Sequence, residues 1–188
     1  MQHKPHLNNF KLISMKKIII IFITALFIGC DTAPIGVQVT FDDEKSNAIR
    51  AHYQNYLNNN VEALQSLWSP DLNIYINSTE AAGVDDISTA ITAQHMVFEN
   101  IKMSFAEDGG EDLGVWVQTI NYPANNGYEA STHTQTWFTW SGTSKISGNE
   151  VVTPVFIGFQ WEDGKIINEW HHYDPTNLNA EMALLPTE

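Results

Sequence analysis

The sequence predicts an α+β domain in which N-terminal helices cover one face of a curved antiparallel sheet. Three observations support this class. Helical patterns fill the first half of the globular part, alternating strand patterns fill the second half, and the strands are joined by short segments rich in turn residues. With 188 residues, the chain is long enough for one domain with its own core and an N-terminal appendage.

The N-terminus has the charge and hydropathy order of an export signal. Lys16 and Lys17 precede a twelve-residue apolar run, 18–29, which is too short to span a bilayer. The run ends at a glycine followed by Cys30, and this ending resembles the lipobox of bacterial lipoproteins, in which the cysteine is acylated and becomes the mature N-terminus. We therefore expect residues 1–29 to be an export signal and the protein to be anchored by lipid in the cell envelope, facing the periplasm or the surface. A cleaved secretory peptide and a retained anchor helix are the alternatives.

The charge of the chain is strongly asymmetric. Four of the nine basic residues and none of the 22 acidic residues lie before Cys30, which leaves a formal charge of 5 − 22 = −17 after it. Such a surface repels phosphate backbones, so we expect no nucleic-acid partner. The single cysteine excludes an intrachain disulfide, and no zinc-ligand spacing is present.

The helices are expected in the first half of the domain, which we place at residues 44–183 after a tether at 30–43. An amphipathic helix starts at Glu44 with Asp42 or Asp43 as its cap. Its inward residues are Ile49, His52, Tyr53, Tyr56 and Leu57. A short helix stopped by Ser69-Pro70-Asp71, a strand from Leu72 to Ile76, and a helix opened by Asp85-Asp86 with Gln94 and His95 on its apolar side follow.

The remainder is predicted to be β structure with a short closing helix or turn through Met182. The expected strands are 101–105, 113–122, 129–140, and the two arms of a hairpin between 151 and 174.

The hairpin from Val151 to Asp174 organises the predicted sheet. Asp163-Gly164 supplies a type I′ turn, which requires positive φ at both central residues. With a regular ladder, Trp161 lies opposite Ile166, and alternation then sets the inner face of the hairpin. Its inner pairs are Trp161 with Ile166, Phe159 with Asn168, Ile157 with Trp170, Val155 with His172, and Thr153 with Asp174. Its outer pairs are Gln160 with Ile167, Gly158 with Glu169, Phe156 with His171, and Pro154 with Tyr173.

This order of elements and the closing segment GKIINEWHHYD resemble the SnoaL-like branch of the NTF2-like superfamily over about residues 44–182. The resemblance implies a cone with a pocket between sheet and helices. Members of the superfamily include polyketide cyclases, ketosteroid isomerases, dehydratases and non-catalytic binders. In SnoaL-like cyclases a carboxylate near the end of the last strands acts as acid or base, and Asp174 matches it by position. The tyrosine and two aspartates of the isomerases find no residue-by-residue match.

Asp174 and His172 are the predicted catalytic residues. They lie two apart on one strand, so both side chains face the same way, about 7 Å apart at the backbone. Asp174 is expected to carry the proton while His172 orients or shares it. The alternative for Asp174 is a helix N-cap with Pro175 at the first helical position, and for His172 a hydrogen-bonded structural histidine.

The remaining candidates would bind the ligand rather than exchange protons with it. Tyr53 or His95 could stabilise an oxyanion, and the strand tryptophans offer apolar surface to a ring. The predicted ligand-binding residues are Tyr53, His95, Trp116, His133, Trp137, Asn168 and Trp170. His171 and His172 are adjacent on a strand and point to opposite faces, so we expect no metal site and no cofactor.

We therefore expect an exported, lipid-anchored domain that binds a small apolar or ring-bearing molecule. If it is an enzyme, the chemistry is cofactor-free acid/base work of the isomerase, cyclase or lyase kind. The alternative is a non-catalytic envelope module that forms a homodimer through the outer sheet face with His171, Tyr173 and Phe156.

Overall fold

The computed structural model describes residues 36–105 and 114–186, so the expected export signal and Cys30 lie outside the described residues. The strands are β1 (Gln38–Thr40), β2 (Trp68–Ile76), β3 (Ala81–Ala82), β4 (Phe98–Ser104), β5 (Trp116–Tyr122), β6 (Ser131–Ser144), β7 (Glu150–Glu162) and β8 (Lys165–Tyr173). The helices are α2 (Glu44–Leu57), α3 (Val61–Gln65), α4 (Val84–Val97) and α5 (Thr176–Met182). In this part of the chain, no helix is both long enough and apolar enough to cross a membrane.

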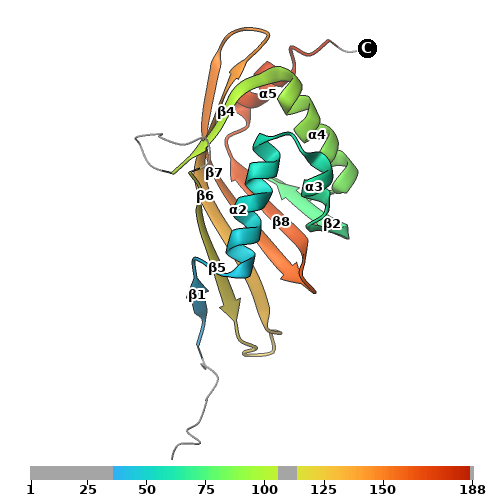
Figure 1. Ribbon diagram of the computed structural model, residues 1–188. Helices are drawn as coiled ribbons and strands as arrows, with labels where there is room; N and C mark the ends of the chain where they lie inside the picture. The colour runs from blue at the N-terminus through green and yellow to red at the C-terminus, as the bar shows by residue number, and fades with distance from the viewer. Residues whose placement is uncertain (1–35, 106–113, 187–188) are drawn as a thin grey trace, which may run out of the picture. The chain divides into compact units, whose positions relative to one another are not determined.

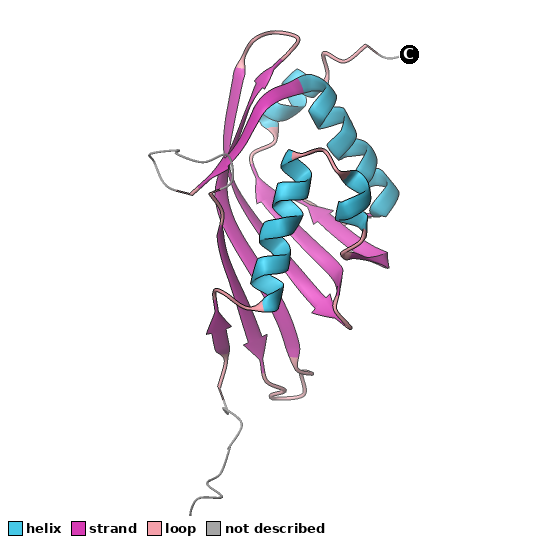
Figure 2. Cartoon of the chain, viewed as in Figure 1, coloured by secondary structure: helices cyan, strands magenta, loops and turns pink. Residues whose placement is uncertain are grey.

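The strands form one mixed sheet that carries the helices on one face. Its order is β1-β5-β6-β7-β8-β2-β3, and β4 pairs with the second half of β6. Figure 1 and Figure 2 show α2, α3 and α4 lying over the same face of this sheet. The pairs are antiparallel as expected, except that β2 runs parallel to β8. We call the helix-covered face the inner face and the opposite one the outer face.

Helix α2 forms as the sequence predicts, because its cap and its apolar spacing are local signals. The carboxylate of Asp43 accepts backbone N–H bonds from Lys45 and Ser46 at 2.9 and 3.1 Å. Ile49 and Tyr53 are buried in the core that α2 shares with the sheet. The helix therefore holds its inward residues at fixed positions above the inner face.

Two elements differ from the prediction. The second helix ends at Gln65, and β2 begins at Trp68, so Pro70 lies inside a strand rather than before it. The β2–β8 register shifts between Trp68 and Asn73, which accommodates a proline that cannot donate a ladder hydrogen bond. In addition, part of the predicted tether forms β1 and pairs with β5.

The β7–β8 hairpin has the predicted turn but not the predicted register. Asp163 and Gly164 both have positive φ, 47° and 75°, and Trp161 pairs with Ile166 as expected. Gln160 then pairs with Asn168, which leaves Ile167 as an extra residue in β8.

This β-bulge reverses the alternation along the rest of β8. Phe159 pairs with Glu169, and Ile157 pairs with His171. The predicted inner pairs of Asn168, Trp170 and His172 are therefore wrong. Glu169, His171 and Tyr173 face the helices instead.

Candidate functional site

A pocket of about 140 Å³ lies between α2, α4 and the inner face of the sheet. Its walls are mainly aromatic and aliphatic, with a few polar groups, which is the usual composition of a small-molecule site. The lining residues are His52, Tyr53, Tyr56, Leu64, Trp68, Ile76, Ile87, Ala90, Ile91, Gln94, Met103, Phe138, Trp140, Thr153, Val155, Ile157, Phe159, Glu169, His171, Tyr173 and Leu178.

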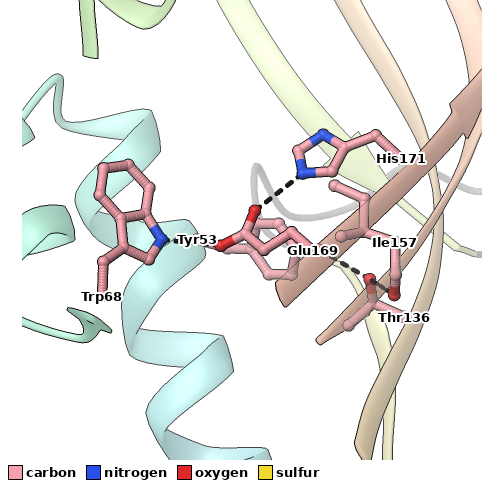
Figure 3. Close-up of polar contacts among 6 residues, drawn as sticks. All are labelled: Tyr53, Trp68, Thr136, Ile157, Glu169 and His171. Atoms are coloured by element: carbon pink, nitrogen blue, oxygen red, sulfur yellow. Dashed lines mark hydrogen bonds and ion pairs between the residues drawn. The ribbon is translucent and has the colours of Figure 1, made fainter. Parts of the chain in front are cut away.

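Glu169 is the buried carboxylate of this pocket, with 2% of the residue exposed. Trp68 Nε1–H donates to its Oε1 at 2.7 Å, and His171 Nε2 lies 2.8 Å from its Oε2. Figure 3 shows the carboxylate between the indole and the imidazole. A hydrogen bond donated by Nε2 of His171 to this carboxylate leaves the Nδ1 of the same ring for another group. The pair has the contact distance needed for proton exchange through a relay.

His52 brings a second imidazole to the pocket from α2. Its ring packs edge-on against Trp68, with centroids 5.5 Å apart. Burial lowers the pKa of His52 to about 4, against the raising effect of Glu169, so this ring is neutral at pH 7. Its Nδ1 is buried and has no hydrogen-bond partner among the described residues.

The hydroxyl of Tyr53 already donates its proton to another side chain. Thr136 Oγ1 donates to the carbonyl of Ile157 at 3.1 Å, so the 2.7 Å contact between Tyr53 and Thr136 must have the tyrosine as donor (Figure 3). Burial raises the pKa of Tyr53 well above its ordinary value. The Tyr53 oxygen therefore faces the pocket as an acceptor, not as the oxyanion donor expected from the sequence.

A second hydrogen-bond chain supplies a donor. Trp140 Nε1–H donates to the Tyr56 hydroxyl at 2.8 Å, and because an indole can only donate, Tyr56 in turn donates to Gln94 Oε1 at 2.8 Å. The amide N–H₂ of Gln94 is therefore left for a ligand. Gly142 permits this arrangement, since a Cβ there would lie 2.8 Å from Cη2 of Trp140.

The structure places both predicted catalytic residues outside the pocket. Asp174 is exposed just before α5, whose N-cap position is Pro175, and its Oδ1 accepts from the backbone N and the hydroxyl of Thr176 at 3.0 and 2.6 Å. These bonds lower the pKa of Asp174. His172 is also exposed and stacks on Phe156 of the outer face at 5.9 Å. Their proposed roles depended on an inward orientation that the bulge removes.

Four of the predicted ligand-binding residues lie on the outer face of β6 and β8. Trp170 stacks on His133 at 6.0 Å and on a tyrosine of β2 at 6.2 Å. Asn168 donates to Gln160 at 2.8 Å, and Trp137 packs on Phe156 at 5.1 Å. None of these side chains lines the pocket.

The other three predicted ligand-binding residues have different positions. Trp116 is 43% exposed beside Phe41. His95 packs its edge on Tyr56 at 5.2 Å, outside the pocket lining, and its Nε2 is buried without a partner among the described residues. Tyr53 alone of the predicted set lines the pocket.

Sequence reasoning did not assign Glu169, His171 or Gln94 to the site, although it placed Gln94 on the apolar side of its helix. The available signal was the adjacent apolar pair Ile166-Ile167 next to the turn, which leaves room for a bulge. Only the bulge brings this carboxylate and this imidazole to the inner face. Across the described residues, no group of three or more His, Cys, Asp or Glu side chains is placed to hold a metal ion.

No model of a known protein family matches the chain, and no curated protein matches it in sequence. Solved structures do match. A candidate polyketide cyclase from Xanthomonas campestris is 14% identical, with a TM-score of 0.53, over 73% of this chain and 95% of its own. IdmH, a candidate polyketide cyclase from Streptomyces antibioticus, is 13% identical with a TM-score of 0.52, over 76% of this chain and 100% of its own. An NTF2-like protein of unknown function from Burkholderia pseudomallei is 10% identical with a TM-score of 0.51, over 75% and 98%.

These likenesses establish the fold. The chain has the NTF2-like α+β architecture, with helices packed on a curved, open sheet, and this confirms the predicted fold class. At 10 to 14% identity they do not carry over a substrate or a catalytic residue. Function has to be argued from the pocket.

Proposed function

We propose that this domain binds a small, largely apolar molecule in the pocket and exchanges protons with it through Glu169 and His171. The observation that carries the proposal is a buried carboxylate hydrogen-bonded to an imidazole at 2.8 Å in an aromatic pocket. Burying a carboxylate costs free energy, and acid/base sites are commonly built from such buried carboxylates.

The donor and acceptor groups fit cofactor-free chemistry at a carbon next to a carbonyl. Glu169 or the free Nδ1 of His171 would take the proton, and the free amide of Gln94 would donate to the carbonyl oxygen. The structural neighbours named as candidate polyketide cyclases have the same fold, which agrees with this class of reaction.

Exchange of carbon-bound hydrogen with solvent tests the proposal without knowledge of the natural substrate. A panel of monocyclic ketones and amino ketones is incubated with the protein in D₂O, and deuterium uptake next to the carbonyl is followed by NMR. We expect Glu169→Gln to slow protein-dependent exchange by about 10²-fold or more, since a positioned base contributes on that order.

Asp174→Asn is the matched control, because it removes a carboxylate of the same strand end that lies outside the pocket. It should leave the exchange rate unchanged. Loss of exchange in Asp174→Asn together with normal exchange in Glu169→Gln would restore the sequence-based assignment. Binding without any exchange would leave a non-catalytic binding module.

We also propose that the protein is exported and held at a membrane by a lipid on Cys30. The support is the order of Lys16-Lys17, apolar run and cysteine. Cells grown with radioactive fatty acid should yield a labelled protein in the membrane fraction, and Cys30→Ser should abolish the label. An unlabelled wild-type protein would exclude the anchor.

A third proposal concerns assembly. The outer face carries Trp137, Phe156 and Trp170, and its strand β6 has no Asp, Glu, Lys or Arg. Aromatic, charge-poor surfaces are typical of protein interfaces. We propose a homodimer through this face, with Phe156 in the interface; His171 and Tyr173 face the pocket and are not part of it. The oligomeric state in solution tests this proposal.

A further inference from the structure

The pocket has an unbalanced set of charges. Its described lining residues include one carboxylate, Glu169, and neither lysine nor arginine. The two hydrogen bonds to Glu169 come from an indole and an imidazole, and neither needs to be charged to make them. His52 is neutral at pH 7. Taking a carboxylate out of water costs several kcal/mol unless a positive group compensates it.

The walls around Glu169 also favour positive charge. Seven Phe, Tyr and Trp side chains line the pocket: Tyr53, Tyr56, Trp68, Phe138, Trp140, Phe159 and Tyr173. Ring faces attract a cation by about 0.5 to 2 kcal/mol each when water is excluded. A neutral apolar molecule gains the same contact area but displaces water from the carboxylate without replacing it. An anion is repelled both by Glu169 and by a chain with a net charge of −13.

Size limits the ligand further. The pocket volume, about 140 Å³, is close to that of an engineered cavity of about 150 Å³ that holds one benzene molecule. A compact head group of about one ring fits this space.

We propose that the pocket binds a small organic cation, an alkylammonium group of about the size of one ring, against Glu169 and the surrounding aromatic walls. The inference rests on the proposed function in taking this pocket as the ligand site. It adds the charge and the size of the ligand, and it holds whether or not the protein is an enzyme.

Choline and its neutral carbon analogue 3,3-dimethylbutan-1-ol form a matched pair of probes, because they differ mainly in the charge of the central atom. Their binding to the purified protein is measured by isothermal titration calorimetry at pH 8, above the ordinary pKa of an imidazole of about 6.5. We expect choline to bind at least tenfold more tightly than the alcohol. Glu169→Gln should remove that preference and leave the affinity for the alcohol unchanged, and Asp174→Asn should preserve both.

The outcomes separate the two proposals. If the alcohol binds as tightly as choline, the cation inference is overturned and the pocket remains a site for a small apolar molecule. If neither probe binds the wild type at millimolar concentration, the cation inference is overturned, and the deuterium-exchange measurement still decides the proposed function. The wild-type comparison decides the question even if Glu169→Gln does not fold, which its thermal unfolding curve would reveal.

Discussion

At the scale of single residues, β8 buries a carboxylate at a position where a purely structural strand would bury an apolar side chain. Glu169 is buried, whereas Trp170 beside it is only half-buried on the outer face. Full burial of a tryptophan removes about 150 to 250 Å² from water and stabilises a fold by roughly 4 to 6 kcal/mol. A strand that buries a carboxylate and leaves a tryptophan partly exposed departs from the rule that cores bury apolar side chains. Such departures concentrate at functional sites.

His52 gives a pH-dependent prediction at the same scale. Its pKa is about 4 in the folded protein and about 6.5 in an unfolded chain, so only the unfolded state takes up a proton as the pH falls between these values. Stability from this residue is complete above pH 6.5 and is lost toward pH 4. At pH 5 the loss is about 2 kcal/mol. His52→Phe should abolish this part of the acid sensitivity, as measured by urea unfolding at pH 7.5 and pH 5.

His172→Phe is the control for the removal of an imidazole, because His172 is exposed. Glu169 and His171, the charged or titratable groups that face His52, remain in both variants. An acid sensitivity of His52→Phe equal to that of the wild type would show that His52 is not held neutral by burial.

At the scale of elements, the sequence predicts those features that depend on neighbouring residues. The cap and apolar stripe of α2 and the turn at Asp163-Gly164 are encoded within a few residues, and all of them form as expected. The helix-first, strand-last order was also sufficient for the fold class. Local signals therefore account for most of the architecture.

The site could not be predicted in the same way, because it depends on a register between strands far apart in the sequence. The bulge at Ile167 lies where β8 also meets the irregular stretch of β2 around Pro70. Successive side chains of a strand point to opposite faces of the sheet. One inserted residue therefore moves every later side chain to the other face. Tyr53 was found because helix α2 sets its direction locally, whereas the orientation of Glu169 and His171 required knowledge of the pairing partner.

At the scale of the whole molecule, charge restricts how copies can meet. The chain after Cys30 has 22 acidic and five basic residues, so most pairs of surfaces repel each other. The outer face is different, because β6 in its middle has no charged side chain and burial lowers the pKa of His133, which keeps that ring neutral. In a two-fold dimer the same surface patch of each protomer meets across the interface. A neutral patch therefore avoids the like-charge repulsion that a charged patch would face.

Phe156→Glu tests this interface, because it places the same negative charge on both copies next to Trp137 and His172. We expect the wild type to sediment as a dimer at micromolar concentration and the variant to need at least a tenfold higher concentration to dimerise, since facing like charges oppose association. Tyr128→Glu adds the same charge at a position that is 79% exposed, between β5 and β6, and should not change the dimer. A wild type that remains a monomer at concentrations up to 100-fold above the micromolar range would contradict a homodimer through the aromatic outer face. Equal dissociation of both variants would trace any self-association to net charge rather than to this face.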